Sequence, residues 1–430
     1  MKKNILLILA AAGVASIGAQ AGNVESNTTE PATNEIAAES VSETSEPSES
    51  QNAVVSAAPD TKVIVASTTI NEKPKFKIAP SGRILADGAV FGPDGHGFTD
   101  GVALPDIRIG VSASYGKWSA KVDLGFGNFK FSPKDIFIQY KFNDENLLRG
   151  GYFVHQFGYQ SATSSSFKCA MEAPSTDDFF KATARNLGLM YVLDKPHFFM
   201  GTSVIFGASD NLTADNITRQ SLGILGRFVW RPICETGKMV QVGISAWNQW
   251  PQHKKGEKGS YSFSANYPTR VVKVGMLEAN LEDAGDMVKL SPELLLSYDR
   301  FALESQYYYM NVDRHGGQGN YVAQGAYGWL RCLLFGDRQY KYSHADAGIA
   351  TPGAKTLELV AGYNYTNASH KDIRGGISND ASITFNYYFN KYLLFRLGYR
   401  YSTARDSQKL AEFGGQRHVN MVSARIQFKF

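Results

Sequence analysis

The stretch Val422-Ser-Ala-Arg-Ile-Gln-Phe-Lys-Phe430, with which the chain ends, alternates strictly between apolar and polar side chains. In an extended strand one face carries Val422, Ala424, Ile426, Phe428 and Phe430, and the other carries Ser423, Arg425, Gln427 and Lys429. A period of two over nine residues predicts a β-strand with one apolar face. The opposite face bears full charges, which suits a wall that meets water on that side.

The same alternation recurs upstream of this strand. In Ile107–Tyr115 the odd-numbered positions are apolar or aromatic, whereas Arg108 and the other even-numbered positions are polar or glycine. The composition agrees, because 26 Phe and 22 Tyr favour strands and 41 Gly favour tight turns. Further alternating runs are Trp118–Phe126, Asp135–Phe142, Leu222–Arg231, Val240–Trp250, Phe301–Met310, Leu357–Tyr365, Ile383–Phe389 and Leu393–Tyr401.

Two all-β architectures fit such a pattern. A soluble sandwich buries the apolar face inside, whereas a membrane barrel turns that face toward lipid and keeps polar groups in a wet lumen. Aromatic clusters such as Tyr307-Tyr308-Tyr309 and Tyr387-Tyr388-Phe389 favour the barrel, because membrane barrels carry aromatic girdles at both interfaces. We therefore predict an all-β, transmembrane, antiparallel β-barrel of about 16 strands in outer-membrane lipid. The terminal Phe430 resembles the signal that such barrels present to the barrel assembly machinery.

The first 75 residues differ from the rest of the chain. Residues 1–21 have two lysines, an apolar run and an Ala19-Gln20-Ala21 cleavage site, which predicts a signal peptide; a short membrane anchor is the alternative. Residues 22–75 contain nine acidic residues, three lysines and no aromatic residue, which predicts a disordered acidic tether rich in Ser, Thr, Glu and Pro. Residues 76–430 would form the barrel. An exported barrel is expected in the outer membrane of a Gram-negative bacterium.

The predicted barrel domain is basic. Five of the 44 basic and nine of the 40 acidic residues precede Phe76, which leaves 39 and 31, a net charge of +8. A barrel of about 16 strands encloses an aqueous channel, and charged rings in such a lumen set ion preference. Alternation assigns to the lumen Lys77, Arg83, Arg108, Lys121, Lys141, Arg149, Arg227, Arg231, Arg396, Arg400, Arg425 and Lys429, against Asp87, Asp123, Asp135, Glu304 and Glu358. The excess predicts anion preference, although lumen charges that pair with one another would only keep the wall wet.

One segment is predicted to narrow the lumen. Phe167–Lys181 follows a strand that ends near Gly158, and it carries the charged residues Lys168, Glu172, Asp177, Asp178 and Lys181. A long loop at this position would fold inward as a constriction. An ordinary outer loop is the alternative.

Around this segment the chain resembles the phosphate-selective porin O/P family. The resemblance begins in Gly151-Tyr-Phe-Val-His-Gln-Phe-Gly158, continues through Ala162-Thr-Ser-Ser165 and Glu172, and reappears in two later places. These are Tyr321–Gln324 through Gly336–Lys341, and Asn386-Tyr-Tyr-Phe-Asn390. It covers about residues 76–430 and depends on the order and spacing of these motifs.

The resemblance implies a sixteen-stranded homotrimer with inward loops and a ladder of basic residues that guides small anionic solutes, phosphate or other oxyanions among them. The family's paired arginines are represented here by Arg108 alone, its constriction lysine corresponds roughly to Ser166 with Lys168 nearby, and its arginine-rich inward loop resembles Thr269–Met276. General anion passage is therefore expected more than tight phosphate selectivity. The predicted pore-lining, anion-binding residues are Arg108, Arg149, Lys168, Arg227, Arg231, Arg270, Lys273, Arg396, Arg400 and Arg425.

Other function classes find less support in the sequence. A barrel hydrolase would need a nucleophile and a base together, and His155 near Ser164–Ser166 is the one suggestion of such a pair. A structural or non-selective barrel remains an alternative, in which lumen-side aromatics such as Phe153 and Trp247 block the passage. No cofactor, metal ion or nucleic acid is expected. Cys169, Cys234 and Cys332 are predicted as packed thiols, with one disulfide as the alternative.

Overall fold

The computed structural model describes residues 75–92, 97–181, 185–207, 217–254, 258–345 and 347–430. The predicted signal peptide and all of the predicted tether except Lys75 lie outside the described residues. Within the described part no helix is long and apolar enough to cross a membrane.

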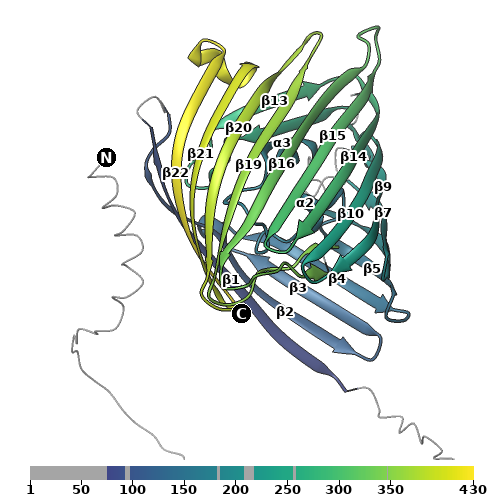
Figure 1. The fold of residues 1–430 in the computed structure, drawn as a ribbon. Coiled ribbons are helices and arrows are strands. Elements are labelled where there is room, and N and C mark those ends of the chain that lie inside the picture. The colour runs from purple at the N-terminus through teal and green to yellow at the C-terminus, as the bar shows by residue number, and fades with distance from the viewer. Residues whose placement is uncertain (1–74, 93–96, 182–184, 208–216, 255–257, 346) are drawn as a thin grey trace, which may run out of the picture. The chain divides into compact units, whose positions relative to one another are not determined.

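Sixteen antiparallel strands close into one barrel (Figure 1). Each strand pairs with the next one along the barrel, as the alternating sequence pattern predicts for an antiparallel sheet. In order around the barrel they are β1 (Lys77–Phe91), β2 (Gly101–Tyr115), β3 (Trp118–Gly125), β4 (Ser132–Lys141), β5 (Asn146–Phe153), β6 (Asn186–Lys195), β7 (Phe198–Phe206), β9 (Leu222–Glu235), β10 (Lys238–Trp250), β14 (Ala284–Tyr298), β15 (Phe301–Arg314), β16 (Tyr321–Phe335), β19 (Thr356–His370), β20 (Ile373–Tyr388), β21 (Leu393–Ser407) and β22 (Gln416–Lys429).

The first and last strands close the barrel. β1 pairs with β22 from Arg83 opposite Lys429 to Phe91 opposite Met421, and Gly82 and Phe430 exchange two backbone hydrogen bonds of 3.1 and 3.0 Å. Closure leaves no unpaired strand edge, which is the condition for a sheet in lipid. The predicted count of sixteen strands is confirmed.

The remaining elements are short. They lie in connections between barrel strands and include α2 (Gly158–Ala162), α3 (Ser175–Lys181), the 3₁₀ helices η2 (Gly127–Phe129) and η4 (Gln408–Phe413), and the strand pairs β8 (Ile217–Arg219) with β11 (His253–Lys254), β12 (Tyr261–Asn266) with β13 (Gly275–Leu281), and β17 (Tyr342–Ser343) with β18 (Gly348–Ile349).

The two faces of the barrel wall follow the predicted alternation. Large apolar side chains such as Ile109, Ile244 and Phe228 are exposed on the outside, whereas the neighbouring charged side chain Arg227 is buried inside. In a soluble sandwich the apolar side chains would be the buried ones. The outward apolar face is therefore the lipid-facing surface of a transmembrane barrel.

The connections at the two ends of the barrel differ. At the end where β1 begins and β22 finishes, here called the turn end, several strands reverse in two residues. Gly116 between β2 and β3 and Gly237 between β9 and β10 have φ of +57° and +77°, a left-handed conformation that glycine adopts without a Cβ clash. At the other end, the loop end, the connections are mostly longer.

The wall is not equally tall all round. β3 to β7 contain eight to ten residues each, whereas the other eleven barrel strands contain 13 to 16. The strands of the two sets differ in length by several residues. At about 3.3 Å per residue this difference is roughly one to two nanometres. The side formed by β3–β7 is called the low wall below.

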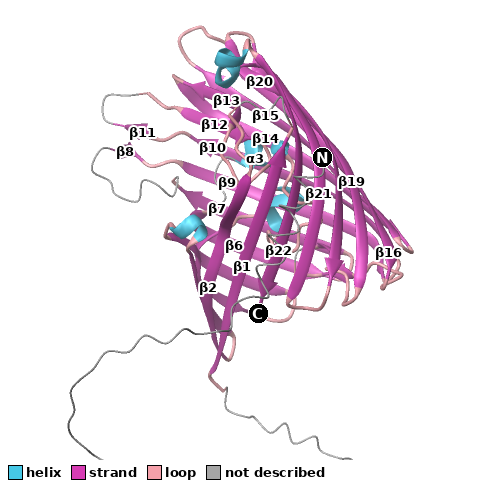
Figure 2. Ribbon diagram, turned by 90° about the vertical axis from the view of Figure 1, so that its left-hand side faces the viewer, coloured by secondary structure: helices cyan, strands magenta, loops and turns pink. Residues whose placement is uncertain are grey.

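Three connections fill much of the lumen. Residues 154–181, called the constriction loop below, run inward from the loop end and carry α2 and α3, and α3 lies between the strands in Figure 2. They include the predicted constriction segment Phe167–Lys181. The hairpin β12–β13 packs against α3 and against β19–β21. Residues 336–355, called the turn-end segment, enter from the opposite end, and Tyr340 and Ile349 pack there with Tyr159 of α2. The inward fold of the constriction loop is confirmed.

Candidate functional site

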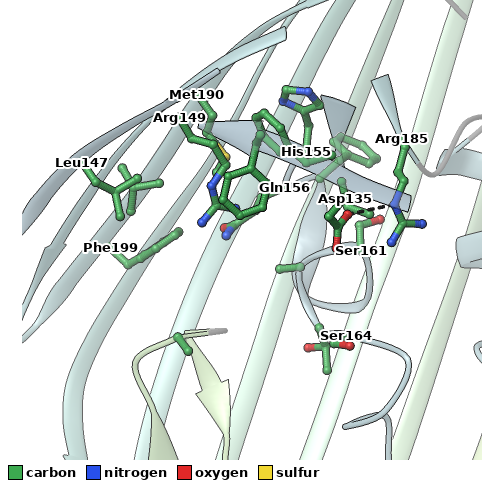
Figure 3. Close-up of a pocket in the computed structure, with 18 of the residues that line it drawn as sticks. Asp135, Leu147, Arg149, His155, Gln156, Ser161, Ser164, Arg185, Met190 and Phe199 are labelled. Atoms are coloured by element: carbon green, nitrogen blue, oxygen red, sulfur yellow. Dashed lines mark hydrogen bonds and ion pairs between the residues drawn. The ribbon is translucent and has the colours of Figure 1, made fainter. Parts of the chain in front are cut away.

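A cavity of about 620 Å³ lies between the low wall and the constriction loop. β3 to β7 supply one side of it, and residues 154–168 with α3 supply the other (Figure 3). Seven basic side chains line the cavity, against five acidic ones. The basic side chains are Arg108, Lys121, Lys141, Arg149, Lys168, Lys181 and Arg185, and the acidic ones are Asp135, Asp144, Glu145, Asp177 and Asp194.

Hydrogen bonds hold the constriction loop against the tall side of the barrel. The backbone N–H of Gly158 donates to Ser245 Oγ at 2.8 Å, and Gly158 has a φ of +79° that permits the sharp entry into α2. Ser175 Oγ donates to Asp380 at 3.0 Å at the start of α3. At the end of α3, the buried Lys289 ammonium donates to the carbonyl of Phe180. The loop is thus fixed at several points and narrows the lumen as a rigid element.

Three predicted pore-lining arginines on β21 and β22 bind this loop. Arg425 makes bonds of 2.7 and 2.6 Å to Asp87, donates to the Met171 carbonyl at 2.8 Å, and pairs with Glu172. Arg396 donates to the carbonyl of Ala170 at 2.9 Å, and Arg400 lies 3.5 Å from Asp380. Their side chains point inward as predicted, but they are buried and do not line the cavity.

Two further predicted arginines bind the turn-end segment. Arg227 pairs with Glu293 at 2.6 Å and donates to the Ala347 carbonyl at 3.1 Å. Arg231 donates to Tyr342 Oη at 2.9 Å and pairs with Asp194. Both arginines have side chains that are fully buried. In this half of the barrel the lumen charges therefore pair with one another. The sequence analysis left such pairing open as the alternative to anion preference.

One residue of the predicted inward loop Thr269–Met276 contacts the constriction loop. Arg270 Nε donates to Glu172 Oε2 at 2.8 Å, so the tip of the β12–β13 hairpin is linked to the constriction loop. Lys273, in contrast, is exposed and does not line the cavity.

Arg108, Arg149 and Lys168 are the predicted residues that line the cavity. Arg108 Nε donates to Asp106 at 2.8 Å, and its guanidinium lies 3.7 Å from Asp123. Lys168 Nζ donates to the carbonyl of Gln160 at 2.9 Å and lies 3.7 Å from Asp177. The structure thus brings together three of the ten predicted residues in one passage.

Four lining cations were missing from the predicted site. Alternation had assigned Lys121 and Lys141 to the lumen, whereas Lys181 and Arg185 had no such assignment. Lys181 was recognised as a loop charge only, and Arg185 falls just before β6, where alternation gives no direction. Arg185 Nε donates to Asp135 at 2.8 Å across the mouth of the cavity (Figure 3). Lys181 and Arg185 could have been identified from the sequence as basic residues near the end of a long inward loop.

The arrangement does not resemble a hydrolytic site. His155 Nε2 lies 3.1 Å from the carbonyl of Asn186, while Ser165 and Ser166 accept hydrogen bonds from Arg83. Burial lowers the pKa of His155 to about 4, so the ring is neutral at pH 7 and adds no charge to the cavity. Among the described residues no cluster of side chains suits a metal ion, and the three cysteines are free thiols.

Comparison with known proteins adds a family match. The sequence profile described as phosphate-selective porin O and P matches residues 103–430. A search of curated proteins found no match.

Solved structures with the same fold include three outer-membrane proteins. The anion-selective porin from Comamonas acidovorans has a TM-score of 0.53 at 11% identity and covers 83% of this chain and 100% of its own. The outer membrane channel DcaP of Acinetobacter baumannii has a TM-score of 0.52 at 11% identity, with 83% and 97% covered. OmpT of Vibrio cholerae, in a trimer form, has a TM-score of 0.52 at 10% identity, with 83% and 99% covered. At these identities the likeness concerns the fold.

Proposed function

The chain belongs to the phosphate-selective porin O and P family, and from that membership we propose that it forms a water-filled channel that passes small anions in preference to cations. The observation that carries the proposal is the cationic cavity beside the low wall. Seven basic and five acidic side chains line it, and the tall half of the lumen is occupied by the constriction loop, the β12–β13 hairpin and the turn-end segment. Fixed charges in a narrow wet passage raise the local concentration of counter-ions.

Cations on both sides of the cavity support this route. Lys121, Lys141 and Arg149 project from the low wall, and Lys168 and Lys181 project from the constriction loop. Arg227, Arg331 and Arg425 of the tall half are each paired with a carboxylate, so they add little field to the passage. We place the functional basic ladder on the low wall, with Arg108 and Lys168 at the constriction.

Charge reversal on the low wall tests the proposal. In planar bilayers under a KCl gradient, the unaltered protein should give a zero-current potential of the sign that reports chloride preference. Lys121→Glu with Lys141→Glu should abolish or invert that preference, because two charges change sign along one wall of the passage and its net charge falls by four units. The matched control is Lys371→Glu with Lys391→Glu, which makes the same charge change at turns outside the cavity. Cation preference in the unaltered protein, or equal potentials for the two double variants, would refute the proposed route.

Trimeric assembly is part of the proposal. The fold is shared with OmpT of Vibrio cholerae in its trimer form, and an apolar outer wall offers area for contact between copies. Light scattering of the detergent-solubilised protein, corrected for bound detergent, should give three times the chain mass of 47.2 kDa before any cleavage. A monomer mass under these conditions would contradict the assembly but not the channel.

A further inference from the structure

Arg149 differs from the other basic residues of the cavity. Its Nε and Nη2 both donate to Gln139 Oε1, at 3.0 and 2.7 Å, and Gln139 is neutral. The other six lining cations each contact a carboxylate within 4 Å, but the described residues provide no such contact for Arg149. Its positive charge is therefore not compensated by a carboxylate, and it remains available to an anion in the cavity.

Aromatic and aliphatic side chains surround this guanidinium. Its central carbon lies 4.3 Å from the ring centroid of Phe137 and 5.4 Å from that of Phe153. Leu147, Met190 and Phe199 lie on the same part of the low wall, and Figure 3 shows them around Arg149. These five apolar side chains are called the apolar patch below, and they line the cavity where alternation would place polar groups. Phe137 and Leu147 are its partly exposed members, and they pack on Phe153, Met190 and Phe199, which are at most 2% exposed.

An apolar patch in a wet passage is unfavourable unless it contacts something apolar. Water forms no hydrogen bonds with such a surface. An inorganic anion that touched it would lose bound water and gain no hydrogen bonds in return. An organic anion, in contrast, can place its charged end on Arg149 and its hydrocarbon body on the patch. Arg also stacks on planar π systems, which favours an aromatic body.

His155, which also lines the cavity, adds no charge beside the patch. Its Nε2 lies 3.1 Å from the carbonyl of Asn186, and its Nδ1 is buried. Arg149 is therefore the cation that adjoins the apolar patch without a carboxylate partner among the described residues.

The size of the cavity fits a small organic molecule. Its volume of about 620 Å³ lies within the range of roughly 300–1,000 Å³ that is usual for small-molecule sites. A six-membered ring with one carboxylate fills only part of such a space, so it can bind and still move on.

We propose that the cavity is a transit site for organic monoanions with an aromatic or other apolar body, held by Arg149 and the apolar patch in preference to inorganic phosphate. This inference rests on the proposed anion channel, and it names the solute class of that channel. The occupancy is transient, because diffusion through a channel requires a site that releases its solute.

Competition with chloride current tests the inference. Benzoate, acetate and inorganic phosphate are added separately to the unaltered protein in planar bilayers, and the concentration that halves the chloride current is measured for each. Benzoate should act at a concentration about tenfold below that of acetate, because it adds burial of a ring to the same carboxylate. Equal half-blocking concentrations for benzoate and acetate, or stronger block by phosphate, would overturn the proposal.

Two substitutions separate the charge from the patch. Arg149→Gln should raise the half-blocking concentrations of benzoate and acetate alike, by about tenfold, the effect of one charge-assisted hydrogen bond. Leu147→Asn should raise the value for benzoate and leave that for acetate unchanged. The matched control is Arg108→Gln, which removes a lining cation that already contacts Asp106. An equal effect of Arg149→Gln and Arg108→Gln on benzoate block would assign the binding of the carboxylate to the net charge of the cavity and would overturn the role proposed for Arg149.

The outcomes keep the two proposals apart. An anion-preferring channel without discrimination between benzoate and acetate would refute the transit site and leave the proposed function intact. Cation preference, or the lack of any channel, would refute the proposed function itself. If Arg149→Gln does not fold, the comparison of the three anions on the unaltered protein still decides, and Arg149→Lys gives the graded variant.

Discussion

Replacing Arg331 by Met is expected to lower the free energy of unfolding by about 3–5 kcal/mol, because the substitution leaves a buried carboxylate without its cation. Arg331 binds Glu358 at 2.8 Å and lies 3.8 Å from Glu304, and all three side chains are at most 3% exposed. Tyr340, Tyr388 and Asn386 also donate to Glu358. These donors cannot neutralise the charge. Urea titration of the refolded barrel in lipid vesicles, followed by tryptophan fluorescence, measures the change.

An exposed ion pair provides the matched control for Arg331. Arg374 contacts Asp406 at the same distance of 2.8 Å, but the two side chains are 64% and 41% exposed. Arg374→Met should therefore cost no more than about 1 kcal/mol. Adding Glu358→Gln to Arg331→Met should recover part of the loss, since the uncompensated charge disappears. Equal effects of the two Arg→Met substitutions would show that the interior of the barrel is well hydrated at this point.

Shortening the turn-end segment should raise the single-channel conductance severalfold. Phe335 and Leu357 are register partners at the ends of β16 and β19, so a short Asn-Gly connection in place of residues 338–353 can join the strands directly. The change removes Tyr340, Tyr342 and Ile349 from the lumen, and it should open a second wet route in the tall half of the lumen. Anion preference should fall at the same time, because the wider lumen is less influenced by fixed charges.

A substitution that keeps the side-chain volume separates the effect of filling the lumen from the effect of the hydrogen bonds. Tyr342 Oη donates to Gln241 at 2.8 Å and accepts from Arg231, so Tyr342→Phe removes both hydrogen bonds and keeps the ring. The conductance of this variant should stay close to that of the unaltered protein, although its stability falls. Unchanged conductance of the shortened barrel would mean that the turn-end segment does not limit the flow of ions.

Much of the barrel could be predicted from the sequence, because the alternation is local. In Ile107–Tyr115 the parity of each position decides which side chain meets lipid, and the structure has Ile109 outside and Arg108 inside. The strand number followed from counting such runs and is confirmed. The inward constriction loop was predicted instead from a long charged segment after a strand and from the family resemblance, and it is confirmed as well.

The partners of the lumen charges could not be predicted. Asp87 and Arg425 are 338 residues apart and meet only because β1 and β22 close the barrel. Glu293, which binds Arg227, was not recognised as a lumen residue, since its strand was not among the predicted runs. Without such partners, Arg227 and Arg425 were expected to line the pore, whereas they hold inward segments in place. Arg149 lines the cavity, and its hydrogen-bond partner, Gln139, is its register partner on the adjacent strand.

The unequal height of the wall gives the channel a slanted rim. The eight to ten residues of β3–β7 suffice for about one crossing of the hydrocarbon layer, whereas the strands opposite extend beyond it. An oblique barrel opening has a larger area than an opening perpendicular to the barrel axis. A solute can therefore reach the lumen sideways over the lower edge as well as along the barrel axis. The tilt of the rim thus enlarges the area from which the opening collects solutes.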